Sequence, residues 1–464
     1  MGKKNNKEQV IKNTYALNEL LHKHGIGEKI RSQFVGTCLL ALKNDLKYKG
    51  LKTKQILSGI ESTITDLLED KDLNKAQKLV ILKNKVLDSQ DVRDLKAENI
   101  QEILKKIDDD ILPYINDRST MGQDILNLFF TTFNKYVGKA DKNQAFTPDH
   151  IVHFMCQVVG INRNSRVLDP CCGSGAFLVR AMTEAMDDCA TEEERKEVKK
   201  KQIYGIEAEE TAFGLSTTNM LIHSDGNSNI RMGSCFENDD FIKDAKINVV
   251  LMNPPYNAQR RYSNPTYVKN WKKDAKEDPS KGFHYVHYIA SKVKTGKLAV
   301  LLPMACAIGG EKAKDIRNFK EKMLQEHTLD AVFSLPPDVF HPGASANACC
   351  MVFNLGTRHE RAPIKETFFG YFKDDGFIKR KNLGRVEKTK PNSDEGVWAD
   401  IESHWLELYR NRKSEKGLSV TKQVTAQDEW LAEAYMETDY SKITEKDFEQ
   451  TIRDFLAYQI MTGR

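Results

Sequence analysis

The chain has 464 residues, which is long enough for two or three domains that each bury their own core. Its 70 basic and 66 acidic residues give a formal net charge of +4, so any strongly basic surface must be local. The longest apolar run, residues 298–308, is too short to span a membrane, and no apolar segment of a secretory signal follows the basic start. The nine cysteines lack the C-x-x-C spacing of zinc or redox sites, so we expect free thiols in the cytoplasm and no bound metal.

Residues 1–140 show the apolar spacing of helices. Val10, Thr14, Leu17 and Leu21 recur at helical intervals until Gly25 offers an end, and further helices are predicted near residues 30–42, 74–86, 100–111 and 125–136. The lysines between these positions are interpreted as solvated faces. A bundle of this kind is most simply a packing module, and its composition does not indicate whether it contacts nucleic acid.

A strong helix start follows a joint at residues 138–141. Thr147 as N-cap, Pro148 as the first helical residue and Asp149 in the first turn predict a helix that runs to about residue 158. Beginning this helix is a sufficient role for the three residues. Their position just before the glycine turn described next suggests a second role.

A glycine turn lies at residues 169–175. Val167 and Leu168 end a buried strand, and Gly173 and Gly175 let the backbone turn tightly before a helix. A strand, a glycine turn and a helix N-terminus together form a place where a ligand can contact bare backbone. Any tight turn favours glycine, however, and an NAD-type fingerprint fits poorly because Leu178 occupies its third small position.

An acidic residue, Glu207, ends the next predicted strand at residues 203–207. A carboxylate one strand–helix unit after a glycine turn suits hydrogen bonds from the hydroxyl groups of a ribose. The competing interpretation is a carboxylate that caps the following helix.

The apolar strand at residues 248–252 runs directly into Asn253, Pro254, Pro255 and Tyr256. Two prolines cannot donate ladder hydrogen bonds, so the strand must end there with free carbonyl groups. The amino nitrogen of adenine is a poor nucleophile because its lone pair is delocalised into the ring. If the Asn253 side-chain oxygen and the Pro254 carbonyl accept its two N–H bonds, that lone pair is freed to attack a methyl group, and Tyr256 can stack on the base.

Taken in chain order, these elements resemble the motifs of adenine-N6 DNA methyltransferases with the gamma motif order, and the whole chain resembles the modification subunits of type I restriction-modification systems. The resemblance rests on Phe146-Thr147-Pro148, Asp169 to Gly175, Glu207 and Asn253 to Tyr256. It implies an α/β fold, with a Rossmann-like methyltransferase domain that uses S-adenosylmethionine at residues 141–356. It also implies an N-terminal helical domain at 1–140 and a largely helical segment for subunit assembly at 357–464.

The resemblance further implies roles for single residues. S-adenosylmethionine would be held through its methionine part by Phe146, Thr147, Pro148, Asp169, Pro170, Cys171, Gly173, Ser174 and Gly175, and through its ribose by Glu207. Its adenine would meet Ser234, Cys235 and Phe236, where Ser234 replaces the acidic residue that is usual in the family. The target adenine, flipped out of the duplex, would be held by the catalytic loop of Asn253, Pro254, Pro255 and Tyr256, with Asn253 also bordering the cofactor.

Basic and aromatic residues follow this loop, namely Arg260, Arg261, Tyr262, Lys269, Lys272 and Lys273. They are predicted to track DNA phosphates and stack on bases, although a solvated loop has the same composition. The segment 336–342 resembles the family's loop beside the target-base pocket. The implied partners are double-stranded DNA, a specificity subunit that chooses the sequence, and a restriction subunit, with two copies of this chain in each complex.

Two other functions remain open. The Asn-Pro-Pro-Tyr loop also occurs in methyltransferases that use the same cofactor on RNA amino groups or on protein glutamine. The non-enzymatic alternative is an assembly subunit that binds the cofactor after its own activity has decayed. Ser234 supports this alternative, and the intact loop from Asn253 to Tyr256 argues against it.

Overall fold

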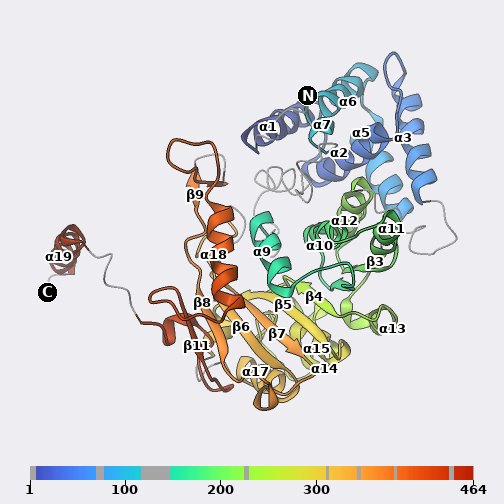
Figure 1. Ribbon diagram of the computed structural model, residues 1–464. Helices are drawn as coiled ribbons and strands as arrows, with labels where there is room; N and C mark the ends of the chain where they lie inside the picture. Colours follow the sequence, from blue (N-terminus) through green and yellow to red (C-terminus); the bar gives the residue numbers. More distant parts are fainter. Residues whose placement is uncertain are drawn as a thin grey trace.

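The computed structural model describes residues 7–68, 78–115, 147–223, 229–309, 313–341, 346–380, 384–437 and 444–462. Phe146, the helix predicted near 125–136 and the proposed boundary at 140 lie outside these ranges. Figure 1 shows a helical region beside a mixed α/β region, with the last helix, α19 (Glu445–Thr462), lying apart from both. Among the helices of the described ranges, none combines the length and the apolar character that a membrane span requires.

The N-terminal helices pack around one apolar core. Three of the predicted helices are confirmed as α1, α2 and α6, whereas α3 was not predicted although Ile56, Ile60, Ile64 and Leu68 follow helical spacing and are all buried. The helices of this region are α1 (Lys7–Lys23), α2 (Glu28–Lys43), α3 (Thr53–Leu68), a π-helix (Leu82–Leu87), α5 (Gln90–Arg93), α6 (Ala97–Asp110) and α7 (Leu112–Ile115).

A nine-stranded sheet forms the centre of the α/β region, in the order β11-β8-β6-β7-β5-β4-β1-β2-β3. β7 runs antiparallel to both of its neighbours and β11 antiparallel to β8, while the other pairs are parallel. The predicted α/β class is therefore confirmed. The strands are β1 (Val167–Asp169), β2 (Ile203–Glu207), β3 (Asn229–Met232), β4 (Val249–Met252), β5 (Gly296–Pro303), β6 (Thr328–Ser334), β7 (Ala348–Leu355), β8 (Thr367–Tyr371) and β11 (Ser419–Lys422).

Successive strand residues point to opposite faces of the sheet, and here both faces are apolar. Helices cover both faces. Val249 and Leu251 belong to the core beneath α9 (Asp149–Val159), α10 (Ala176–Asp187) and α18 (Trp398–Arg410). Val250 and Met252 belong to the core beneath α13 (Asp239–Asp244), α15 (Phe283–Lys292) and α17 (Lys314–Glu326). Two further helices, α11 (Glu192–Lys201) and α12 (Glu210–Ile222), flank β2, and α12 also packs on α2.

The order of the strands reverses between β1 and β4. From β1 the chain proceeds outward to β2 and β3, and then returns to place β4 on the other side of β1. In open α/β sheets, ligands bind outside the carboxyl ends of the strands at such a reversal. The parallel register pairs Val167 with Val249 and Leu168 with Val250, so the segments that follow β1 and β4 leave the sheet side by side.

The segment 357–464 contains more strand than expected. It adds β8 and β11 to the edge of the sheet and forms a separate hairpin of β9 (Phe377–Arg380) and β10 (Gly384–Glu387), besides α18 and α19. The strands have only four or five residues, which is too short for a periodic pattern to distinguish them from loops. Sheet pairing with β6 supplies the order that the local sequence does not indicate.

Candidate active site

The loop after β4 holds its asparagine through both ends of the carboxamide. Asn253 Nδ2 donates a hydrogen bond to Thr147 Oγ1 at 3.1 Å, and the Tyr256 hydroxyl donates to Asn253 Oδ1 at 2.8 Å. Oδ1 is a carbonyl oxygen, which acts only as a hydrogen-bond acceptor. The next acceptor along the loop is the Pro254 carbonyl, to which no described residue donates a hydrogen bond.

Thr147 does not cap the helix that follows it, contrary to the sequence-based expectation. The helix α9 begins at Asp149 with Pro148 in the N-cap position, and Pro148 has no side-chain cap. The Thr147 hydroxyl is 106 residues from Asn253 in sequence and contacts it instead. A short polar side chain before a helix predicts a cap, and only the tertiary structure shows that its hydroxyl serves another segment.

The glycine turn after β1 is fixed mainly by backbone contacts. Cys172 N donates to Ile206 O at 3.0 Å, and Gly175 N donates to Cys172 O at 2.7 Å. Gly175 has φ +86°, and a Cβ there would lie 3.3 Å from Ser216 Cβ, so both conformation and space require glycine. Gly173 has φ +51° but a Cβ there would meet nothing within 4 Å, so this glycine borders open space.

Glu207 joins the glycine turn to the start of α12. Its Oε2 accepts a hydrogen bond from Gly173 N at 2.8 Å, and its Oε1 accepts one from Glu209 N at 2.8 Å. The N-cap of α12 is Glu209, whose side chain accepts from Ala212 N, so Glu207 is not the cap residue. Burial raises the pKa of Glu207, and the two backbone N–H groups oppose this shift.

Asp169 is a second carboxylate in the same place, with 2% of its surface exposed. Burial raises the pKa of Asp169 to about 8, against the hydrogen bond from Cys171 N, and the nearby charge of Glu207 raises it further. Among the described residues, no lysine or arginine forms an ion pair with Asp169 or Glu207. One buried and one partly buried carboxylate without such a cation favour a positively charged ligand.

The residues predicted to meet the cofactor's adenine form a short turn after β3. The Ser234 hydroxyl accepts a hydrogen bond from Phe236 N at 3.3 Å and so caps the 3-10 turn Cys235–Glu237. The Phe236 ring stacks on His284 of α15, with 5.5 Å between ring centroids and 17° between planes. Ser234 thus has a local structural role, and Cys235 is buried.

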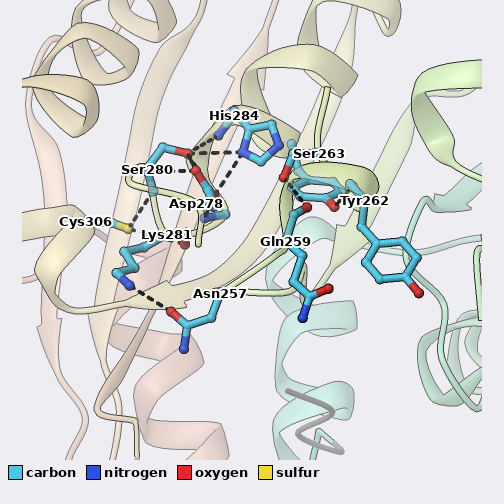
Figure 2. A network of polar contacts seen from close by, with 11 residues as sticks. Asn257, Gln259, Tyr262, Ser263, Asp278, Ser280, Lys281, His284 and Cys306 are labelled. Atoms are coloured by element: carbon cyan, nitrogen blue, oxygen red, sulfur yellow. Dashed lines mark hydrogen bonds and ion pairs between the residues drawn. The ribbon is translucent and has the colours of Figure 1, made fainter. Parts of the chain in front are cut away.

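The basic segment after the catalytic loop contains residues of two kinds. Arg260 supports the segment itself, because its guanidinium donates to the carbonyls of Ala275 and Lys272 and lies over the Trp271 ring. The remaining predicted DNA-binding side chains are exposed: Arg261, Tyr262, Lys269, Lys272 and Lys273. Arg261 and Lys273 line a surface hollow of about 580 Å³, and Figure 2 shows Tyr262 projecting from the same segment.

A buried ion-pair cluster that the sequence did not indicate holds the start of α9. His150 Nε2 lies 2.9 Å from Asp375 Oδ2, and Arg385 binds both oxygens of Asp375 at 2.6 and 2.7 Å. Arg385 also lies 3.4 Å from Asp338, within the segment 336–342. Burial alone would raise the pKa of Asp375, but the hydrogen bonds from His150 and Arg385 lower it to about 2.

Known proteins share both the sequence pattern and the fold. A family model described as N-6 DNA Methylase matches residues 116–457. The type II restriction enzyme and methyltransferase RM.BcgI of Heyndrickxia coagulans is 32% identical over 351 residues, which cover 74% of this chain and 50% of that protein. The type I restriction enzyme EcoEI methylase subunit of Escherichia coli is 26% identical over 260 residues, covering 55% of this chain and 49% of that protein.

The chain therefore spans about half the length of these two relatives. Among solved structures, the type I restriction-modification system methyltransferase subunit from Streptococcus thermophilus superimposes with a TM-score of 0.56 at 15% identity. That match covers 90% of this chain and 96% of the other chain. At this level of identity the likeness concerns the fold.

Proposed function

The chain belongs to the N-6 DNA methylase family, and from this premise we propose that it transfers a methyl group from S-adenosylmethionine to the N6 amino group of adenine in double-stranded DNA. The resemblance predicted from the sequence is thus confirmed at the level of the family. One observation carries the proposal further. The Asn253 carboxamide is held between Thr147 and Tyr256 at the end of β4, next to the glycine turn after β1.

The residues around the glycine turn fit S-adenosylmethionine. This cofactor carries a sulfonium and an ammonium group, and the buried Asp169 and the partly buried Glu207 are carboxylates that form no ion pair with a lysine or arginine among the described residues. The free second lone pairs of Glu207 suit the ribose hydroxyls, and the open space beside Gly173 leaves room for the ligand. When bound, the cofactor supplies an electrophilic methyl group. Thr147 holds the Asn253 carboxamide from the segment that precedes α9.

The catalytic loop orients the acceptor. Asn253 Oδ1 and the Pro254 carbonyl accept the two N–H bonds of a flipped adenine, which localises the lone pair of N6 for attack. The N6–carbon bond forms as the sulfur–carbon bond breaks in line, and the excess proton of N6 passes to water. Tyr256 supports Asn253 through its hydroxyl and offers its ring to the base. No covalent enzyme intermediate is needed.

DNA binds along the basic segment in this proposal. Arg261, Lys269, Lys272 and Lys273 neutralise phosphates, and Tyr262 stacks on a base, while Arg260 keeps the segment folded. A specificity subunit chooses the sequence, and two copies of the chain act with it and with a restriction subunit. The Escherichia coli relative is a methylase subunit of a type I restriction enzyme, which supports the proposed place in such a complex.

The experiment is an assay for 6-methyladenine by mass spectrometry of nucleosides. The full chain, alone and co-purified with the specificity subunit encoded beside it, is incubated with duplex DNA and S-adenosylmethionine. We expect 6-methyladenine with the wild type, and a loss of at least about a hundredfold with Asn253→Ala, whose cofactor affinity is retained. RNA and protein substrates are assayed in parallel. Methylation of these alone, or cofactor binding without any methyl transfer, would contradict the proposal.

A further inference from the structure

A buried polar cluster lies behind the catalytic loop and consists of Asp278, Ser280 and His284 (Figure 2). Their exposed fractions are 0%, 0% and 2%. The Ser280 hydroxyl donates to Asp278 Oδ1 at 2.8 Å, and His284 Nδ1 lies 3.0 Å from Asp278 Oδ2. Backbone groups complete the cluster, since Gly282 N donates to Asp278 Oδ2 at 2.6 Å.

The three residue types are those of a hydrolytic triad, but their arrangement does not suit nucleophilic attack. Ser280 is fully buried, so no substrate can reach its hydroxyl. That hydroxyl lies within hydrogen-bond distance of both Asp278 oxygens and 3.1 Å from His284 Nδ1, the same ring nitrogen that contacts Asp278, whereas in a triad serine and aspartate contact opposite nitrogens of the histidine. The cluster therefore fixes structure. It orders the turn 278–282, where Lys281 has φ +52° and Gly282 has φ +93°.

This turn makes three contacts with the catalytic loop and the two residues that follow it. Asp278 N donates to Ala258 O at 3.0 Å, and Lys281 Nζ donates to Asn257 Oδ1 at 2.8 Å. At Gly282 a Cβ would lie 3.2 Å from Pro254 Cγ, so the backbone of the turn packs closely on the first proline of the loop. Figure 2 shows Lys281 reaching from the turn to Asn257.

The opposite side of the cluster faces the turn that is proposed to meet the cofactor's adenine. The His284 ring lies between two aromatic rings, with centroid distances of 5.5 Å to Phe236 and 4.8 Å to Tyr267. Asp278 is ionised near neutral pH: burial would raise its pKa, but His284, Gly282 N and Ser280 together lower it. The cluster thus connects the cofactor side of the site to the target-base side.

We propose that Asp278, Ser280 and His284 form a positioning unit for the catalytic loop, and that Lys281 transmits its position to the loop through Asn257. Pro254 and Pro255 donate no backbone hydrogen bonds, so the loop depends on contacts from outside itself. Displacement of a reacting group by roughly 1 Å can reduce a rate about a hundredfold. This inference rests on the proposed methyl transfer and names the residues that position its acceptor site.

Lys281→Asn is the most selective test, because asparagine tolerates a positive φ and lacks the ammonium group. We expect kcat for DNA methylation to fall about tenfold, while the Kd for S-adenosylmethionine stays within about twofold and the melting temperature is unchanged. Lys281→Arg, which keeps a donor of similar reach, should restore most of the rate. The matched control is Lys246→Asn, which changes a lysine with φ +49° before the amino end of β4, opposite the strand end that carries the catalytic loop, and should leave kcat unaltered.

A double-mutant cycle locates the contact. If Lys281 acts through Asn257, Asn257→Ala should reduce kcat to a similar extent, and the double variant should lose little more than either single variant. Additive losses, or a wild-type rate for Lys281→Asn in an enzyme that Asn253→Ala inactivates, would overturn this inference and leave the proposed function standing. Absence of methylation by the wild type would instead overturn the proposed function.

Discussion

The two strand ends that form the candidate site are stabilised in different ways. After β1, the turn 169–175 is held by backbone N–H groups that bond to Ile206, Cys172 and Glu207, and by glycine conformations. After β4, the loop 253–257 contains two prolines and is held by side chains from distant segments, Thr147 and Lys281. Backbone contacts make a rigid cradle, whereas side-chain contacts make a loop whose position depends on the rest of the molecule. We expect substitutions at the first end to change ligand affinity, and substitutions around the second to change turnover.

The largest effect is expected from breaking the ion-pair cluster that holds the start of α9. Arg385→Gln removes the guanidinium that binds both oxygens of the buried Asp375, and should lower the free energy of unfolding by about 3 kcal/mol. Denaturation in urea measures this value. Lys388→Gln on the same hairpin is the control, since its pair with Asp374 is exposed at 3.6 Å and should change stability by less than about 0.5 kcal/mol. Equal losses of unfolding free energy in both variants would show that the buried cluster contributes no more than an exposed ion pair.

The backbone-held end is tested by its two glycines. Gly175→Ala forces φ +86° on alanine and brings its Cβ within 3.3 Å of Ser216, so we expect a loss of about 1–3 kcal/mol in stability. Gly173→Ala meets no protein atom and should cost about 1 kcal/mol, yet its methyl group enters the space assigned to the cofactor.

Calorimetric titration with S-adenosylmethionine measures the affinity of both variants. Gly173→Ala should lose much affinity although it loses little stability, because its methyl group enters the space assigned to the cofactor. An unaltered affinity in that variant would show that the ligand does not occupy this space.

The carboxylates of the same end predict a pH dependence. Burial raises the pKa of Asp169 to about 8, so its contribution to stability is present below its ordinary value of 3.8 and is lost as pH rises through 8. The melting temperature of the wild type without cofactor should therefore fall relative to that of Asp169→Asn between about pH 4 and pH 8, and should remain lower at pH 9.

Bound S-adenosylmethionine offsets the free-energy cost of ionising the buried Asp169, because the ionised carboxylate attracts its positive charge. Between about pH 7 and pH 9, the affinity for S-adenosylmethionine should rise in the wild type relative to Asp169→Asn. The cofactor's own amino group titrates in the same way with both proteins, so the comparison with the variant removes its contribution. Parallel affinity curves for the two proteins would refute the role of Asp169.

A pH effect outside the candidate site is expected at His153, between α10 and α18. Burial alone would lower the pKa of His153, but hydrogen bonds to Glu184 and Glu402 raise it to about 9. Its contribution to stability is full below its ordinary value of 6.5 and is lost as pH rises through 9, by about 1–2 kcal/mol. His153→Gln should flatten this slope in thermal melts, and His404→Gln, at an exposed pair with Glu415, should keep it.

The sequence indicated the constraints at the end of β1 more fully than those at the end of β4. The first are local in the sequence, whereas the second come from distant segments. Gly173, Gly175 and Glu207 could be singled out from the sequence because their constraints are local: a turn, a strand end and a short spacing. Asn253 was also singled out from its local sequence, but the distant side chains that hold its loop were not, because Thr147 reads as a helix cap and no local pattern marks Lys281 as the partner of Asn257. Contacts between residues 24 to 106 positions apart leave no local pattern.

The same limit applies to the fold. Some strands of the central sheet were predicted, such as β2 and β4. The short strands β8 and β11 were not, because pairing with neighbours at the sheet edge defines them. Ser234 could be singled out from the sequence, yet its role as the cap of a short turn required the structure.

The central claim is that β1 and β4 deliver the methyl donor and the target adenine to one point. The most direct measurement is the structure of the chain, with its specificity subunit, bound to duplex DNA and to an analogue of S-adenosylmethionine that carries an amine in place of the methyl group. We predict a flipped adenine with N6 about 3–3.5 Å from that amine, and with Asn253 Oδ1 and the Pro254 carbonyl accepting its hydrogen bonds. A base that remains stacked in the duplex, or an analogue bound away from Gly173 and Glu207, would contradict the account.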